Sequence, residues 1–175
     1  ANADPQVDLD RDATRYVSGQ VSLKMEQRFA TAYFTTGVWT GTSTGNDITP
    51  AVTWDDAAST PIKDIIDQKR AMTQNVGPDY RPNVLACGAK LFDDLCQHPD
   101  IIDRIKYTAG PGNPAIVNEQ SLAQLFGLQR VIVLRAVQNT AAEGQTASYS
   151  YIANSRSALL AYAAPNPGLQ QPSAG

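Results

Sequence analysis

The sequence predicts an α+β fold in which one long helix precedes a compact region of alternating helices and strands. Apolar residues recur at every fourth position from residue 13 to residue 33, which is the spacing of a ridge on one helix. From residue 59 onward, short capped helix patterns alternate with apolar runs typical of buried strands. A chain of 175 residues can also bury enough surface for one hydrophobic core.

The first expected element is a helix of about 25 residues within the range 7–34, because a single ridge runs through it. Acidic residues lie in its first turns, where the helix dipole favours negative charge. Gly19 in the helix interior costs about 1 kcal/mol relative to alanine, so we expect it to mark a close packing contact or a bend. The ridge consists of Ala13, Val17, Val21, Met25, Phe29 and Tyr33.

A connection rich in Gly and Thr follows over residues 35–54, with one short strand expected around Val38 and Trp39. A second helix then begins at Pro61, with Ser59 or Thr60 as its cap, and stops between residues 75 and 77. Its apolar stripe is formed by Ile62, Ile65, Ile66, Lys69 and Met72.

The remaining elements are shorter. The run YRPNVLACG predicts a buried strand after a proline break, and residues 89–97 and 100–107 predict two short helices. Asn118 caps a helix over 119–126 that Gly127 ends, and RVIVLRA predicts a second strand. Two further strand candidates lie in SYSYIAN and ALLAYAA, separated by SRS.

The composition excludes some classes of partner. Charged residues make up 18% of the chain, and the net charge is −3. A nucleic-acid interface needs clustered Lys and Arg, whereas here they are scattered, so we expect no specific nucleic-acid partner. No apolar run reaches the length of a membrane span, so we expect no membrane partner. Low charge is typical of surfaces that other protein covers.

The stretch from Asn83 to Thr108 contains two cysteines, the single histidine and several aspartates. Cys87 and Cys96 lack the spacing of a zinc or redox pair, and Cys87 ends an apolar strand as a buried hydrophobe would. Cys96 and His98 stand two residues apart, so on a helix they face different sides. Asp93, Asp94, Asp100 and Asp103 fit a solvated face with i, i+3 pairs better than a catalytic pair.

The glycine-rich loop before Asn118 invites a phosphate-cradle interpretation, but its two prolines remove backbone donors and the P-loop Lys is missing. We interpret it as a candidate subunit-contact loop formed by Gly110, Pro111, Gly112, Asn113 and Pro114. Tyr149 and Tyr151 share one face of a strand, where core or subunit packing is the better interpretation than base stacking.

Several segments together resemble the major capsid proteins of tailed bacteriophages and prophages. They are TGVW (36–39), WDDAASTPIKDI (54–65), GPDYRPNVLACGAKLFDDLCQHPDIIDRIKY (77–107), LAQLFGLQRVIV (122–133) and ALLAYAAPNPGLQQPSAG (158–175). The resemblance covers most of the chain from about Phe29 onward. Family members are usually longer, with an N-terminal arm and an extended loop before the long helix, so the chain resembles a truncated core of the family.

The resemblance implies the tailed-phage capsid fold, with a long spine helix and a mixed sheet with flanking helices. It divides the chain into residues 1–58 (spine helix and connection, peripheral domain), 59–145 (axial-domain-like core) and 146–175 (returning strands and tail, peripheral domain). It further implies a subunit without cofactor, metal or catalytic site that forms pentamers and hexamers with itself. Portal or scaffold proteins would be further partners. The expected location is the virion capsid, assembled in the bacterial host cytoplasm.

Two other functions remain open at this point. One is the shell protein of an encapsulating nanocompartment with the same fold. The other is a small intracellular hydrolase or transferase that uses Cys96, His98 or Asp94. A Cys96→Ala variant with every measurable property intact would remove the main support for the enzyme. A genomic neighbourhood without portal or terminase genes would favour the nanocompartment.

Overall fold

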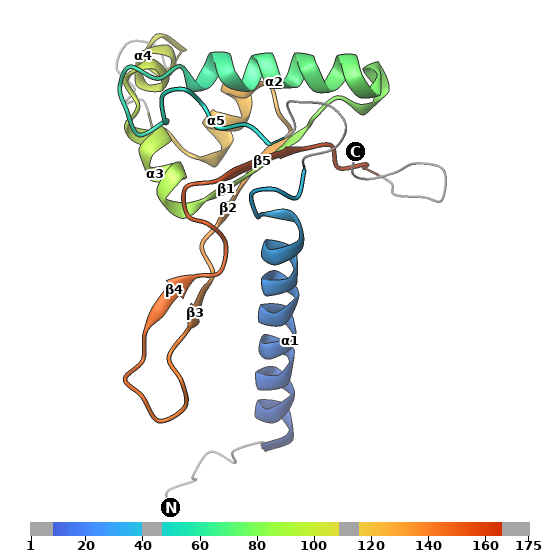
Figure 1. Ribbon diagram of the computed structural model, residues 1–175, viewed down its shortest axis with the longest axis vertical. Helices are drawn as coiled ribbons and strands as arrows, with labels where there is room; N and C mark the ends of the chain where they lie inside the picture. Colours follow the sequence, from blue (N-terminus) through green and yellow to red (C-terminus); the bar gives the residue numbers. More distant parts are fainter. Residues whose placement is uncertain (1–8, 40–46, 109–115, 166–175) are drawn as a thin grey trace, which may run out of the picture.

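The protein consists of a central α/β unit and a limb that extends away from it (Figure 1). The computed structural model describes residues 9–39, 47–108 and 116–165. We call helix α1 and the β3–β4 hairpin the limb, and the other elements the central unit. In chain order the helices and strands are α1 (Leu9–Tyr33), α2 (Pro61–Val76), the 3-10 helix η1 (Pro78–Tyr80), β1 (Val84–Gly88), α3 (Ala89–Gln97), α4 (Pro99–Thr108), α5 (Glu119–Phe126), β2 (Arg130–Leu134), β3 (Val137–Asn139), β4 (Tyr149–Tyr151) and β5 (Ala158–Ala161).

The central sheet has the strand order β2-β1-β5. Strands β1 and β2 run parallel, with Leu85 opposite Val131, and the helices α3, α4 and α5 form the crossover between them. Strand β5 returns antiparallel on the other side of β1, with Leu85 opposite Leu160. Asn83 extends this pairing, since its side chain exchanges two hydrogen bonds of 2.8 Å with the backbone of Ala163. The α+β class with a mixed sheet is therefore confirmed.

The two faces of the sheet are covered differently because side chains alternate along a strand. Leu85 and Cys87 point to the side of helices α2 to α5, where thirteen of the described residues form a buried core. Ala86, between them, points to the other side, where it packs with Ala30 near the C-terminal end of α1 and with Phe34 directly after the helix. Among the described residues, α1 is anchored in the central unit at this end, and the rest of the helix extends away (Figure 1).

Local sequence signals set the helix ends. Asn118 caps α5 through a bond from the Ser121 backbone N–H of 2.8 Å, and the Ser121 hydroxyl accepts from the Asn118 N–H at 2.8 Å. Gly127 ends the helix in the left-handed region with φ +61°, a conformation that glycine adopts without strain. The Lys69 ammonium of α2 donates to the Phe126 and Gly127 carbonyls at 2.6 and 2.8 Å, so a side chain of α2 binds the C-terminal end of α5.

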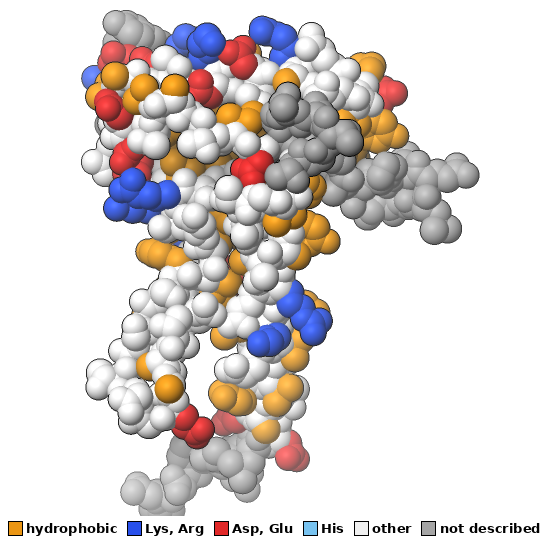
Figure 2. Space-filling model, in the orientation of Figure 1, with side chains coloured by type: hydrophobic (Ala, Val, Ile, Leu, Met, Phe, Trp, Pro, Cys, Tyr) orange, Lys and Arg blue, Asp and Glu red, His pale blue; other side chains and the backbone are white. Residues whose placement is uncertain are grey.

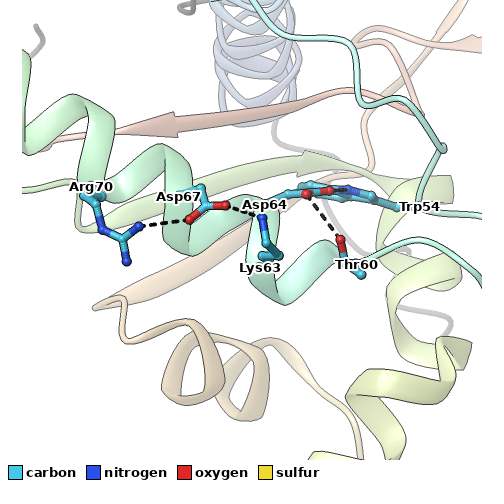
Figure 3. A network of polar contacts seen from close by, with 6 residues as sticks. All are labelled: Trp54, Thr60, Lys63, Asp64, Asp67 and Arg70. Atoms are coloured by element: carbon cyan, nitrogen blue, oxygen red, sulfur yellow. Dashed lines mark hydrogen bonds and ion pairs between the residues drawn. The ribbon is translucent and has the colours of Figure 1, made fainter.

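Helix α2 carries a polar network that joins it to the preceding connection (Figure 3). The Trp54 indole N–H donates to a carboxylate oxygen of Asp64 at 2.8 Å, which fixes residue 54 against the first turn of the helix. Asp67 accepts from Lys63 at 2.7 Å and from Arg70 at 3.2 Å. The contacts of Asp67 with Lys63 and Arg70 are exposed to solvent, which weakens them, so the half-buried indole of Trp54 is the more important anchor.

Two expectations from the sequence are wrong in detail, and one strand was not expected. Val38 and Trp39 form bends and not a strand, because the Trp39 indole N–H folds back to donate to the Tyr33 carbonyl at 2.8 Å. Gly19 lies in a continuous helix, and a Cβ there would meet nothing within 4 Å, so it marks neither a bend nor a packing contact among the described residues. Strand β3 had no expected counterpart, since its polar residues give no alternation.

Candidate assembly surface

Most of α1 is exposed although the helix carries an apolar ridge. From Val17 to Tyr33 the ridge residues remain accessible, with Met25 at 66% and Phe29 at 38% exposure. The aromatic ring of Phe29 contacts that of Tyr33 at 5.6 Å, and Tyr33 contacts Trp39 at 6.1 Å between ring centroids. Hydrophobic side chains are visible along the length of the helix in the space-filling view (Figure 2). The periodic pattern thus produced the predicted helix without a partner for this face among the described residues.

The β3–β4 hairpin also presents apolar side chains to solvent. Val137 pairs with Tyr151 across the hairpin and Asn139 with Tyr149, so these four side chains share one face. Tyr149 is 72% exposed. The opposite face bears Gln138, whose amide oxygen accepts from the Gln27 amide at 2.6 Å and joins the hairpin to α1. The two tyrosines therefore lie on the side of the hairpin turned away from α1, and neither is in the core.

The turn between β4 and β5 attaches the hairpin of the limb to the central unit. The backbone of this turn crosses β1 at Gly88. The Gly88 N–H donates to the Ser157 carbonyl and the Leu91 N–H to the Ser155 carbonyl, each at 2.9 Å. A Cβ at Gly88 would lie 2.4 Å from backbone atoms of Asn154 and Ser155. Arg156 adds an ion pair with Asp55 at 2.9 Å. The backbone of this turn rests directly on the strand, which fixes where the hairpin leaves the central unit.

The predicted contact loop Gly110, Pro111, Gly112, Asn113 and Pro114 lies outside the described residues. Its flanks are described, and they show where it leaves and re-enters the fold. It leaves from the C-terminal end of α4 at Thr108 and returns at Ile116, which is 66% exposed and precedes the capped start of α5. The loop thus joins two helices that pack on the same face of the sheet.

The structure does not bring Cys96 and His98 together as a catalytic pair. The Cys96 thiol lies 3.7 Å from the Val117 carbonyl, whereas the His98 Nε2 lies 3.0 Å from the Ser59 hydroxyl and 3.2 Å from the Asp56 carbonyl. His98 and Ser59 are both buried, so this imidazole holds the connection before α2 against the start of α4. The sequence offered no signal for that contact, because the two residues are 39 positions apart.

Burial disfavours the thiolate form of both cysteines, which is the form that acts as a nucleophile. Burial raises the pKa of Cys87 to about 12, and burial followed by the nearby carboxylate of Asp93 raises the pKa of Cys96. Among the carboxylates singled out in the sequence, Asp103 pairs with Lys106 at 3.7 Å on an exposed helix face. Within the described ranges, no three His, Cys, Asp or Glu side chains gather as a metal site would require.

An open hollow of about 410 Å³ lies at the N-terminal end of α5. Arg135 spans it, with an ion pair to Glu119 at 2.9 Å and its guanidinium 5.3 Å from the centre of the Phe92 ring. Both charged groups of this pair are largely exposed and satisfied by each other, so the hollow is a shallow feature of the surface.

Among the described helices, none is long and apolar enough to cross a membrane.

The sequence is similar to known capsid proteins of bacteriophages. The profile of the family "Phage major capsid protein E" matches residues 41–165. The chain is 32% identical over 81 residues to the major capsid protein of Burkholderia phage BcepMu, an alignment that covers 46% of this chain and 24% of that protein. The chain therefore spans about a quarter of the length of this curated relative in the aligned region.

A solved structure shares the fold. It is the crystal structure of a phage-related protein from Bordetella bronchiseptica RB50, which superposes with a TM-score of 0.76 at 22% identity. The match covers 97% of this chain and 53% of the other. At this identity the likeness shows the fold alone, whereas the family profile extends over most of the sequence and includes the whole central unit. The chain belongs to the phage major capsid protein E family, a family of structural proteins of the virion capsid.

Proposed function

We propose that this chain is the repeating subunit of an icosahedral phage head, and that it assembles with itself into pentamers and hexamers that tile into a shell around DNA. The observation that carries the proposal is the limb. Its apolar side chains on α1 and on the hairpin stay exposed in the single chain, although a protein in water normally buries such surface. In a capsid family member, further copies are the natural source of that burial.

The two parts of the molecule suit different roles in such an assembly. The central unit has its own core and capped helices, so it can keep its shape while contacts form. The limb extends from it and carries much of the exposed apolar surface. We infer that residues 1–58 and 146–175 contribute to a peripheral part and residues 59–145 to an axial part. Strand β5 lies in the segment 146–175 and pairs with β1 of the segment 59–145, so the peripheral part and the axial part would share one sheet.

We propose that the loop 110–114 reaches the centre of a capsomer, that portal or scaffold proteins are further partners, and that assembly takes place in the host cytoplasm. A net charge of −3 supports a shell that encloses DNA without holding its phosphates tightly. The family match favours the head protein over an encapsulating nanocompartment and over an enzyme. The separate hydrogen bonds of Cys96 and His98 also favour a structural role.

The DNA part of this proposal can be tested separately. Purified protein should elute from immobilised duplex DNA at low salt, because no cluster of Lys and Arg is available to replace counterions. A variant with Asp55→Lys and Asp103→Lys, which adds charge at two exposed ion pairs, serves as a positive control for salt-dependent retention. Strong salt-dependent retention of the unmodified protein would contradict the role assigned to its charge.

A further inference from the structure

The middle of helix α1 has no charged residue. Between Arg15 and Lys24 lies the run YVSGQVSL, and its large residues are accessible, with Tyr16 at 69% and Val17 at 58% exposure. A helix face that stays in water is normally charged or polar. Depletion of charge at the centre with charges on both sides is instead the arrangement of a protein interface, with a core and a polar rim.

The middle of the ridge points away from the β3–β4 hairpin. Gln27 marks the inner side of α1, because its amide donates to Gln138 of the hairpin. Met25 and Phe29 lie two residues on either side of Gln27, which with 3.6 residues per turn places them about 160° around the helix from it. Val21 continues the same row one turn earlier. Met25 and Phe29 therefore lie on the side of α1 turned away from the hairpin, and both remain exposed among the described residues.

The exposed surface is large enough to matter. The five ridge residues from Val17 to Tyr33 expose on the order of 500 Å² of side chain, given about 150 to 250 Å² for each whole aromatic residue. A stable interface buries about 800 Å² on each partner, so the ridge and its immediate surroundings suffice. Single apolar residues on a surface need no explanation, but a continuous patch of this size does.

We propose that the α1 ridge pairs with the α1 ridge of a second copy, around a two-fold axis that passes close to Val21. The inference rests on the proposed function, since it names one contact through which copies would associate. Rows of residues at i, i+4 on two identical helices interlock at a crossing angle of about 50°, which makes the ridge complementary to itself. A two-fold contact uses the same patch on both partners and needs no second surface.

The absence of charge near Val21 is what a two-fold contact requires. At the axis each residue faces its own copy, so any charge there would face the same charge and repel it. Ser18, Gln20 and Ser22 around Val21 are all neutral, and the first charges are Arg15 and Lys24 on either side. A helix that met a charged or irregular partner would have no reason to keep two full turns uncharged.

Disulfide trapping tests the contact directly. Val21→Cys is made in a background with Cys96→Ser, while Cys87 stays because it is fully buried. Under mild oxidation Val21→Cys should give at least about ten times more covalent dimer than the matched control Ser22→Cys, which lies about 100° around the helix. Both positions are exposed, so both variants should fold, which circular dichroism verifies.

A charge at the same position gives a second readout. Val21→Glu should raise the dissociation constant of the dimer at least about tenfold in sedimentation equilibrium, because two carboxylates would meet at the axis, whereas Ser22→Glu should leave it within about threefold. Equal cross-linking at residues 21 and 22 overturns the inference. If rings or shells still form in that case, the proposed function stands. Trapped dimers without larger assemblies would support the inference and contradict the proposed function.

Discussion

The substitution Gly88→Ala tests how the limb is attached to the central unit. A Cβ at residue 88 would lie 2.4 Å from the Asn154 carbonyl oxygen and from two backbone atoms of Ser155. Ordinary contacts are at least about 3.4 Å, so the turn must move by about 1 Å. That displacement breaks or weakens the bonds from Gly88 to Ser157 and from Leu91 to Ser155, both 2.9 Å in the native fold.

The expected cost follows from these two effects. Forced overpacking costs about 1 to 3 kcal/mol, and each lost backbone hydrogen bond adds about 1 kcal/mol. We therefore expect Gly88→Ala to reduce the free energy of unfolding by about 3 to 5 kcal/mol. Urea denaturation followed by far-ultraviolet circular dichroism measures the difference between variant and wild type at equal slope.

Gly19→Ala is the matched control, since it adds the same methyl group where nothing lies within 4 Å. In the isolated chain it should raise stability by up to about 1 kcal/mol through the better helix propensity of alanine. A loss below about 1 kcal/mol for Gly88→Ala would refute the close approach of the turn to β1. A loss in the Gly19→Ala control would instead point to a neighbour that the single chain does not contain.

Three further predictions concern a cap, a thiol and the hairpin. Asn118→Ala should lower the free energy of unfolding by about 1 kcal/mol in chemical denaturation, because α5 loses its capping box. Asn118→Asp should retain most of the stability, since aspartate also caps helices. An equal loss in both variants would contradict the capping role of Asn118. Burial raises the pKa of Cys87 from about 9.0 in the unfolded chain to about 12 in the fold. Because the unfolded chain loses this proton first, the contribution of Cys87 to the free energy of unfolding is complete below about pH 9 and is lost as the pH rises toward 12. Wild type should lose about 2 to 3 kcal/mol more than Cys87→Ala between about pH 8 and pH 11, and parallel curves would be inconsistent with the raised pKa. Tyr149→Ser should change stability by less than about 0.5 kcal/mol in the unassembled chain but reduce the assembled fraction measured by sedimentation. The control Tyr162→Ser should destabilise the chain, because the Tyr162 ring contacts Tyr80 edge-on at 5.7 Å between ring centroids. An unchanged assembled fraction for Tyr149→Ser would show that the hairpin face is not a subunit contact.

Local signals in the sequence predicted the central unit well. Helices α3 and α5 and the start of α2 begin and end where proline, glycine and a capping asparagine place them, because these residues act on the backbone within one turn of their own position. The buried strand β1 follows from its apolar run, which the structure shows buried at every position. Such features depend on neighbours in sequence, so a single chain is enough to read them.

Features that depend on distant residues were not predictable in the same way. The hairpin strand β3 is polar and three residues long, and it forms because β4 pairs with it. The contact of Ser59 with His98 joins segments without any shared pattern. The periodicity of α1 predicted an amphipathic helix, but periodicity does not say whether the apolar face is covered by the same chain. The uncharged run 16–23 was the available sign that this helix has a different environment.

The most direct test of a structural, self-assembling role is the mass distribution of the purified protein across a concentration series. Light scattering would measure the mass, and electron microscopy of the largest species would show its form. We expect the average mass to rise with concentration and the largest species to be pentamers, hexamers or closed shells, because the limb leaves apolar surface to bury. A folded monomer of 18.8 kDa at every concentration would contradict the account.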